Sequence, residues 1–318
     1  MIKGRLYQQN YRPQFSGHET FPLRYGWLKK AYDAVRNKPK EERKDIFSRP
    51  EAIADFGVGK NMVISIRHWA TVMDVITEPD EEGVITTTPF GDLIFSPRGF
   101  DPYLENPSTL WLLHWKLTGN PRKTTWYWAF SLFSQRTFER STIVQLLGKL
   151  AEEQRWTRAS TATIKRDVEC LVRTYVPKRI SKKFGFEDSV ECPLTELGLI
   201  KSLGGRDRFE FVVGPKSSLG MGVFLYALDE FWAQRNTSTI SLEAIAHDEG
   251  SPGRVFQLDE SDLIHRFSQI EKISGHDFRW SETAGLKQLI RAKSHNNPMS
   301  KFDSLSLDFQ SKQRAISA

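Results

Sequence analysis

The stretch SRPEAIADFGVGKNMVISIRHWATVMDVI, residues 48–76, carries the strongest indication of fold in this chain. Ser48 and Pro50 are typical of the start of a short helix, because serine caps helix N-termini and proline is favoured in the first turn. Gly57 and Gly59 then allow the backbone to reverse tightly. In the longer helix that follows, apolar side chains recur at helical spacing: Met62, Ile66, Trp69 and Met73. We therefore expect two helices joined by a glycine turn.

The next segment, TEPDEEGVITTTPFGDLIF at residues 77–95, alternates around a glycine and predicts a short two-stranded ribbon. Helix, turn, helix and ribbon is the order of a winged helix-turn-helix. The order recurs with amphipathic helices at 138–154 and 160–176, the second capped by Ser160 or Thr161, and a strand pattern at 192–214. Both candidate wings contain Thr-x-x-Gly, which favours an internal repeat.

Other segments complete the expected architecture. A helix is predicted at 26–37, and the apolar run at 111–117 is typical of a buried helix. Further helices are expected at 257–275 and at 281–293, the latter capped by Ser281. The predicted fold is mainly α with small β wings (α+β): tandem winged helix-turn-helix-like units plus a C-terminal helical region. The predicted domains are a winged-helix-like DNA-binding domain at 1–118, a Trp-rich helical and second winged-helix-like domain at 119–235, and a helical region with a polar tail at 236–318.

Composition excludes several classes of protein. The 318 residues contain no apolar run long enough to span a membrane and no secretory signal at the start. The two cysteines, Cys170 and Cys192, lack the spacing of a zinc or redox site, so a reduced, cytoplasmic setting is expected. Residues 1–50 carry 12 Lys/Arg against 5 Asp/Glu, and residues 122–183 carry 14 against 5. These basic blocks indicate anion-binding faces, although unevenly charged solvated surface remains an alternative.

The longer helix of residues 60–73 is the candidate recognition helix. Its N-terminus presents Lys60 and Asn61 where backbone N–H groups favour a phosphate, and Arg67 and His68 follow two turns later. An alternative is that these are solvated positions of a winged helix used for protein contacts. The candidate DNA-binding residues over the whole chain are Arg24, Lys29, Lys30, Lys60, Asn61, Arg67, His68, Lys165, Arg166, Lys182 and Lys183.

Neither glycine-rich stretch is a nucleotide site. GVGKN at 57–61 lacks the spacing and the Ser/Thr of a P-loop, and SLGMG at 218–222 has no following lysine. We therefore expect no nucleotide or organic cofactor.

The candidate catalytic residues are His18, Glu19, Asp101 and Glu105. A His–Glu pair can do acid–base work or help to hold a metal, but more often it braces a turn. Asp101 and Glu105 could supply carboxylates for a divalent cation such as Mg²⁺ or Mn²⁺, and the alternative is helix capping at a surface turn. The tryptophans of residues 111–128 are expected in the core, with Trp126 and Trp128 as candidates for stacking on unpaired bases.

Five longer motifs bear a resemblance to a bacterial family encoded beside DNA phosphorothioation genes. They are FSGHETFPLRYGWLKK (15–30), GVGKNMVISIRHW (57–69), TPFGDLIF (88–95), GFDPYLENPSTLWLLHWKL (99–117) and TTWYWAF (124–130). The chain resembles the SspB-like family, the DNA-nicking component of single-strand phosphorothioation systems, over roughly residues 13–290. The first motif contains His18, Glu19 and Arg24, and the second contains Lys60, Asn61, Arg67 and His68.

The resemblance implies binding of double-stranded DNA and a single-strand nick that admits sulfur into the backbone, in defence against phage. It also implies three partners: a cysteine desulfurase, an ATPase and an ATP-pyrophosphatase or sulfotransferase-like enzyme. The alternatives are a non-catalytic winged-helix adaptor that recruits these enzymes and a transcriptional regulator of the same operon. No membrane partner is expected, and a homodimer is left open.

Overall fold

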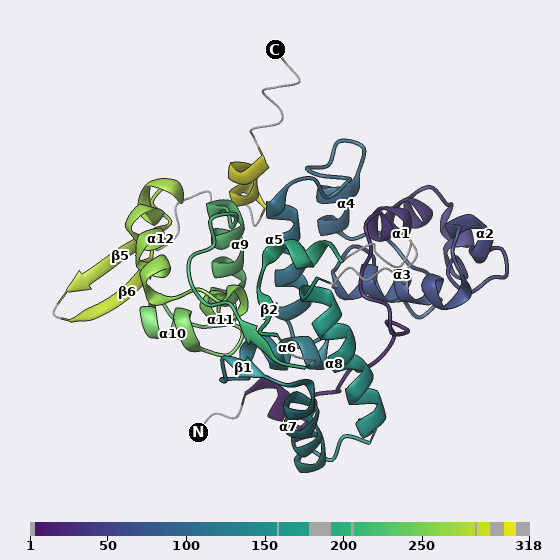
Figure 1. The fold of residues 1–318 in the computed structure, drawn as a ribbon. Helices are drawn as coiled ribbons and strands as arrows, with labels where there is room; N and C mark the ends of the chain where they lie inside the picture. The colour runs from purple at the N-terminus through teal and green to yellow at the C-terminus, as the bar shows by residue number, and fades with distance from the viewer. Residues whose placement is uncertain are drawn as a thin grey trace. The chain divides into compact units, whose positions relative to one another are not determined.

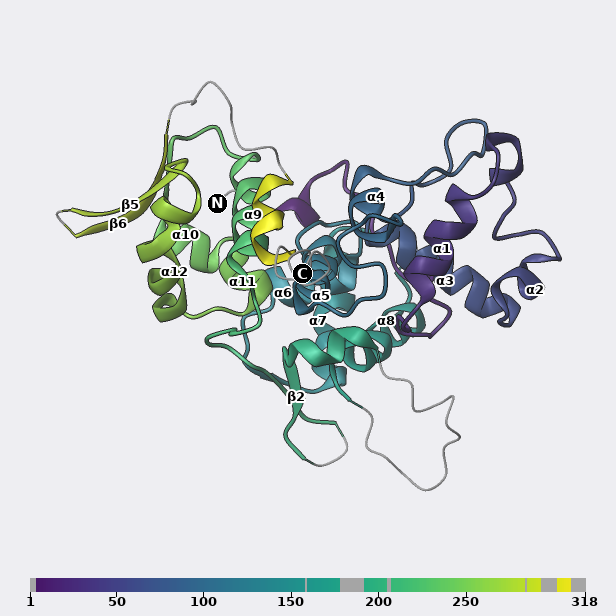
Figure 2. The ribbon, with the colours of Figure 1, turned by 90° about the horizontal axis from the view of Figure 1, so that it is seen from above.

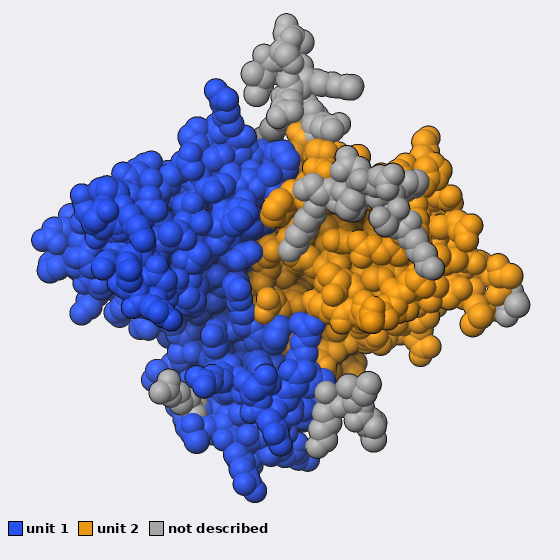
Figure 3. All heavy atoms as spheres, turned by 180° about the vertical axis from the view of Figure 1, so that it is seen from behind, with its two compact units in different colours: residues 1–105, 121–126, 135–210 blue, residues 106–120, 127–134, 211–318 orange. Residues whose placement is uncertain are grey.

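A computed structural model describes residues 4–157, 159–177, 192–204, 207–283, 285–292 and 302–309 of the chain. The chain divides into two compact units, each built from several stretches (Figure 3). Unit 1 comprises residues 1–105, 121–126 and 135–210, and unit 2 comprises residues 106–120, 127–134 and 211–318. The boundaries expected from the sequence at 118 and 235 both fall inside stretches of unit 2.

Unit 1 is mainly helical (Figure 1). Its elements are α1 (Trp27–Arg36), α2 (Ala52–Phe56), α3 (Lys60–Val72), α4 (Pro89–Phe95), β1 (Thr137–Phe138), α7 (Arg140–Glu153), α8 (Thr161–Tyr175), β2 (Ile200–Ser202) and β3 (Phe209–Phe211), with short 3-10 helices η1 (Arg5–Tyr7), η2 (Lys40–Arg43) and η4 (Pro193–Leu197). The last residue of β3 is counted with unit 2, and α6 (Thr124–Ser131) contributes to both units.

Unit 2 combines helices with a second small sheet. Its elements are α5 (Pro107–Thr118), α9 (Met221–Trp232), β4 (Thr239–Ser241), α10 (Leu242–His247), α11 (Pro252–Phe256), α12 (Glu260–Ile273), β5 (Phe278–Thr283), β6 (Leu286–Arg291) and the 3-10 helix η5 (Asp303–Leu305). No helix among the described residues is both long enough and apolar enough to cross a membrane.

The fold is α+β, as the sequence predicts, because two three-stranded antiparallel sheets accompany the helices. The sheets have the orders β1-β3-β2 and β4-β6-β5. In each, the first strand along the chain pairs with the last one, and helices separate the first strand from the hairpin. The repeated strand order therefore relates residues 137–211 to residues 239–291.

The helix–turn–helix of residues 48–76 is present as α2 and α3 (Figure 1). Gly57 ends α2 with a φ of +63°, a backbone conformation that glycine adopts without strain. Ser48 does not cap α2: the helix begins later, after Glu51, and the Ser48 hydroxyl bonds to the carbonyl of Asp45. Ile66, Trp69 and Met73 of the expected apolar stripe are buried, and Met62 is half-buried.

Two sequence predictions of secondary structure are wrong. Residues 89–95 form α4 rather than a strand, because Thr88 caps the segment through the N–H of Gly91 and Pro89 occupies the first turn. Of the expected ribbon there remain the isolated bridge Ile76–Thr87 and backbone hydrogen bonds from Thr77 to Thr86, from Asp80 to Val84 and from Thr88 to Val75. The helix predicted at 281–293 is not found among the described residues of that segment, where 281–283 and 286–291 belong to strands. The hairpin of β5 and β6 turns at Gly285, whose φ is +79°, and Figure 2 shows its two strands side by side.

The tryptophan-rich segments lie in the core, as predicted. In α5, Trp111 and Trp115 are buried and the helix is apolar on nearly all sides. Trp126 and Trp128 are buried as well, so the prediction that they stack on unpaired bases is wrong. Their indole faces are covered by neighbouring side chains, among them Trp69 against Trp126 and Phe133 against Trp128.

Candidate functional site

The loop of residues 16–20 in unit 1 has an unusual backbone. Ser16, Glu19 and Thr20 have φ values of 63°, 46° and 65°, and Gly17 has a φ of 84°. Side-chain-bearing residues rarely adopt positive φ, and each such residue costs on the order of 1–3 kcal/mol. Strain of this kind persists only where surrounding contacts hold it, and it clusters at functional sites. The loop is therefore the centre of the candidate site.

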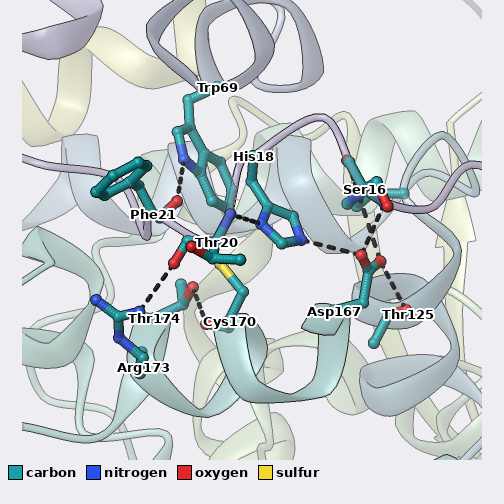
Figure 4. A network of polar contacts seen from close by, with 11 residues as sticks. Ser16, His18, Thr20, Phe21, Trp69, Thr125, Asp167, Cys170, Arg173 and Thr174 are labelled. Atoms are coloured by element: carbon teal, nitrogen blue, oxygen red, sulfur yellow. Dashed lines mark hydrogen bonds and ion pairs between the residues drawn. The ribbon is translucent and has the colours of Figure 1, made fainter. Parts of the chain in front are cut away.

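Asp167, from the middle of α8, holds the loop in place (Figure 4). Its carboxylate accepts hydrogen bonds from the Ser16 backbone N–H at 2.7 Å, from His18 Nε2 at 2.9 Å and from the Thr125 hydroxyl at 3.0 Å. Asp167, His18 and Thr125 are all buried. A buried carboxylate is tolerated only when donors satisfy it, and three donors converge here.

Lys123 supplies a positive charge inside the same cluster. Its Nζ donates to the Ser16 carbonyl at 2.6 Å and lies 3.4 Å from the Asp167 carboxylate, and the side chain is buried. Burial lowers the pKa of Lys123, and the charge of Asp167 opposes that effect. Burial would raise the pKa of Asp167, but the charge of Lys123 and the hydrogen bonds from His18 and Ser16 outweigh it, so that pKa is lowered. The carboxylate is therefore ionised.

His18 has both ring nitrogens occupied. Nδ1 accepts a hydrogen bond from the Thr20 backbone N–H at 3.0 Å, which leaves Nε2 as the nitrogen that carries the proton and donates it to Asp167. The side chain is 1% exposed and also packs against Trp69 and Trp126. In this arrangement both ring nitrogens are hydrogen-bonded inside the protein. Glu19, the next residue, is exposed, so it is the member of the His–Glu pair that solvent or a ligand can reach.

His68, on α3, closes the other side of the loop. A Cβ atom added to Gly17 would lie 2.5 Å from His68 Nδ1, so the two residues fit only because position 17 has no side chain. His68 Nε2 is enclosed and has no hydrogen-bond partner among the described residues. Burial lowers the pKa of His68 well below its usual value, and the charge of Lys123 adds to that effect. His68 is therefore neutral near pH 7.

The segment of residues 16–21 contacts both α3 and α8. On the α3 side, Trp69 Nε1 donates to the Phe21 carbonyl at 3.0 Å, and the His18 ring stacks on Trp69. On the α8 side, Asp167 binds the loop and Arg173 donates to the Thr20 carbonyl at 2.8 Å (Figure 4). The two helices predicted to bind DNA are thus joined through one strained loop within unit 1.

Four cations on these helices have no internal partner. Lys60, Lys165 and Arg166 are exposed and Arg67 is half-buried, and in the part of the chain that the structure covers no ion pair or hydrogen bond engages any of these side chains. Asn61 is exposed beside Lys60 at the N-terminus of α3. Lysine and arginine side chains that are free in this way can neutralise phosphates without breaking an internal contact.

Three other predicted DNA-binding residues make contacts within the protein. Arg24 lies over the rings of Phe21 and Trp27. Lys29 pairs with Asp33 on the same helix, and Lys30 donates to the Phe56 carbonyl. Lys182 and Lys183 lie outside the described residues.

Asp101 and Glu105 form a turn rather than a paired carboxylate site. Asp101 is buried and accepts the backbone N–H of Glu105 at 2.9 Å, which is the capping alternative considered for this motif; the side chain of Glu105 is exposed. A divalent cation such as Mg²⁺ needs several oxygen ligands. Across the described ranges, no three His, Cys, Asp or Glu side chains gather in one place.

Asp167, Lys123 and Thr125 were not among the residues singled out in the sequence. One signal was available for Asp167: it lies among the apolar residues of α8, three positions after Ile164 and four before Leu171. A carboxylate at such a position must have a buried partner. Its partner His18 is 149 residues away, so the pattern of the helix could not identify it.

A groove of about 850 Å³ runs along the exposed sides of α7 and α8. Lys165 lines it from α8, and Arg140, Gly148 and Lys149 line it from α7. Glu152, Glu169 and Asp207 also line the groove, so its charge is balanced. This groove is therefore not a phosphate site by its charge alone.

Three comparisons relate the chain to known proteins. A family model described as "Protein of unknown function (DUF4007)" matches residues 15–305. Two SspB crystal structures match over 98% of this chain and 90% of theirs at 30% sequence identity, with TM-scores of 0.81 and 0.79; the first contains a bound magnesium ion. The comparison with curated proteins found no match.

Proposed function

The chain belongs to the family described as a protein of unknown function (DUF4007), as an SspB-like member, and on that premise we propose that it is the DNA-binding component of a bacterial DNA phosphorothioation system. The observation that carries the proposal is the similarity to SspB over nearly the whole chain, which includes both compact units. The five motifs that resemble the phosphorothioation-associated family fall within the same range. The proposed role is to nick one strand of duplex DNA so that sulfur can enter the backbone.

The surface of unit 1 supports DNA as the ligand. We interpret α2 and α3, followed by a short turn, and α7 and α8, followed by the hairpin of β2 and β3, as winged-helix-like units in which α3 and α8 enter the DNA groove. Lys60, Arg67, Lys165 and Arg166 on these helices are unpaired in the described part of the protein. Free cations on two helices of this kind are suited to neutralising phosphates.

Nicking chemistry would depend on Glu19 rather than on His18. The His18 ring is enclosed, and its nitrogens bind Thr20 and Asp167, whereas the Glu19 carboxylate is exposed on the strained loop. An exposed carboxylate can orient or deprotonate a water molecule. The magnesium ion in one SspB crystal structure belongs to that protein.

Relaxation of supercoiled plasmid tests the nicking proposal. The purified protein is incubated with plasmid, with and without Mg²⁺ or Mn²⁺, and open circles are separated on a gel. We expect Glu19→Gln to abolish relaxation, whereas Glu51→Gln, at another exposed carboxylate of unit 1, should leave it unchanged. Relaxation that survives Glu19→Gln would remove Glu19 from the chemistry; Asp101→Asn and Glu105→Gln then test the second predicted pair.

A non-catalytic adaptor is the second candidate, and one observation favours it. Both nitrogens of His18 are used internally. In this alternative the protein binds DNA and recruits the cysteine desulfurase, the ATPase and the ATP-pyrophosphatase or sulfotransferase-like enzyme. A retained gel shift without plasmid relaxation, together with co-purification of these enzymes, would support the adaptor and contradict the nickase.

A further inference from the structure

The buried cluster around Asp167 is not the arrangement that stability alone would favour. Lys123 and Asp167 are almost completely buried, and replacing a buried ion pair with apolar side chains of similar size is often neutral or stabilising. The cluster also maintains positive φ at Ser16, Glu19 and Thr20, each of which is unfavourable for a residue with a side chain. An arrangement that combines buried charge with backbone strain calls for a role other than stabilisation.

The contacts of the cluster indicate what that role is. Asp167 lies on α8, and its hydrogen bonds pass through Ser16 and His18 into the loop. The loop in turn contacts α3, through the stacking of His18 on Trp69 and the hydrogen bond from Trp69 to Phe21. These bonds are directional and buried, so they determine the position of α8 relative to α3 more narrowly than apolar packing would.

Both helices also carry cations that have no partner among the described residues. On α3 these are Lys60 and Arg67, and on α8 they are Lys165 and Arg166. On α8, Asp167, Cys170 and Thr174 are buried, whereas the side chains of Lys165 and Arg166 are exposed. The loop and its cluster thus leave Lys60, Lys165 and Arg166 exposed and Arg67 half-buried.

We propose that Asp167 and Lys123 are positioning residues for DNA binding: through the loop of residues 16–21 they hold α3 and α8 in one arrangement, so that both helices engage the same duplex at once. This inference rests on the proposed function as a DNA-binding protein. Two sets of phosphate contacts on one rigid body reinforce each other, because the second set binds without a further loss of rotational and translational freedom. Neither residue touches the DNA.

The salt dependence of DNA binding measures how many phosphate contacts the two helices make together. Each phosphate contact contributes about −0.9 to the slope of log K against log salt concentration, so two cations on one helix account for a slope of about −1.8. Loss of these two contacts weakens binding about 60-fold at 0.1 M salt. A variant that merely lowers the fraction of folded protein changes the apparent amount of active protein and leaves the slope of the folded fraction unchanged.

The experiment measures binding of a labelled duplex of about 30 base pairs to five proteins and one control variant, by fluorescence anisotropy between 50 and 300 mM salt. They are the natural chain, the α3 variant Lys60→Ala/Arg67→Ala, the α8 variant Lys165→Ala/Arg166→Ala, the positioning variant Asp167→Asn, and Asp167→Asn combined with the α8 variant. Leu171→Ala is the matched control, because Leu171 is buried in the same helix and its loss destabilises the core without removing a polar contact of the loop. The active fraction of each protein is determined by stoichiometric titration.

We expect the α3 variant and the α8 variant each to reduce the magnitude of the slope by about 2. Asp167→Asn should reduce it by the same amount although all four cations remain, and adding the α8 variant to Asp167→Asn should change little more. Leu171→Ala should keep the natural slope. A natural slope in Asp167→Asn, or a full additional loss when the α8 variant is added to it, overturns the inference.

The failure of the inference is distinguishable from the failure of the proposed function. A natural chain that does not bind the duplex even at 50 mM salt overturns both. A natural chain that binds, with a slope that responds to the α3 variant and not to the α8 variant, leaves DNA binding in place and overturns only the joint engagement of the two helices.

Discussion

Gly17→Ala tests whether the strained loop is held against α3 as the structure shows. Gly17 has a φ of 84°, and an alanine Cβ there would lie 2.5 Å from Nδ1 and 3.0 Å from Cε1 of His68. The left-handed backbone costs alanine roughly 1–2 kcal/mol, and forcing a methyl group against the ring adds roughly 1–3 kcal/mol. Alanine recovers roughly 0.4–1 kcal/mol because it restricts the unfolded chain. The expected loss of unfolding free energy is therefore about 2–4 kcal/mol.

Gly57→Ala is the matched control. Gly57 also has a positive φ, +63°, but a Cβ there would meet no atom within 4 Å. Gly57→Ala therefore has the cost of a left-handed backbone but no clash with a ring, and we expect it to lower the unfolding free energy by only about 1 kcal/mol. The difference between the two variants isolates the contact between Gly17 and His68.

The assay is urea unfolding, combined with hydrogen exchange of the amides of α3 and α8. Two compact units need not unfold in one transition, and exchange reports the opening of unit 1 itself. In a His68→Ala background the ring is absent, so Gly17→Ala should cost about 1–3 kcal/mol less than in the natural protein. The reasoning is refuted if Gly17→Ala costs no more than Gly57→Ala, or if His68→Ala gives no relief.

Three further predictions concern other parts of the molecule. Burial lowers the pKa of His114 to about 3 in the folded protein, so as the pH falls the unfolded chain binds a proton at this residue before the folded protein does. The unfolding free energy should therefore fall by about 2 kcal/mol between pH 7 and pH 5. In urea titrations, a His114→Gln variant should lose that part of the pH dependence. Burial raises the pKa of both thiols, that of Cys192 to about 12, so a thiol reagent should leave Cys170 and Cys192 unmodified until urea unfolds the chain; rapid reaction at neutral pH would contradict their burial. Gly148 lies inside α7, and a methyl group added there would meet no atom within 4 Å. Gly148→Ala should therefore raise the unfolding free energy by about 1 kcal/mol and raise the melting temperature with it. An unchanged or lower melting temperature would indicate a contact that the structure does not contain.

Much of the secondary structure could be predicted because it follows from local patterns. The apolar residues of α1, α3, α7, α8 and α12 recur at helical spacing, and the structure buries those stripes. The errors occurred where a local pattern was compatible with two structures. In residues 281–293 the serine and the apolar residues are compatible with a capped helix and also with a hairpin. The segment forms a strand because β6 pairs with both β4 and β5.

The candidate site was predictable only in part. The unusual motif around His18 and Glu19 drew attention to the loop, and the basic block of residues 122–183 pointed to α8. The sequence could not show that His18 would be enclosed and Glu19 exposed, since adjacent residues in a loop have no periodic pattern of burial. The same limit applies to Arg24 and Lys29, whose positive charges look equivalent to that of Lys60 until their internal partners are known.

The sequence alone determined where helices form, which of their faces are apolar, and which segments carry an excess of positive charge, because these properties depend on residues a few positions apart. Only the tertiary structure decided that Asp167 meets His18, Lys123 and Ser16, since residues separated by 44 to 151 positions come together only when the whole of unit 1 packs. That packing removes the Asp167 carboxylate from water. A buried carboxylate needs hydrogen-bond donors in place of water, and the loop that contacts both α3 and α8 supplies them.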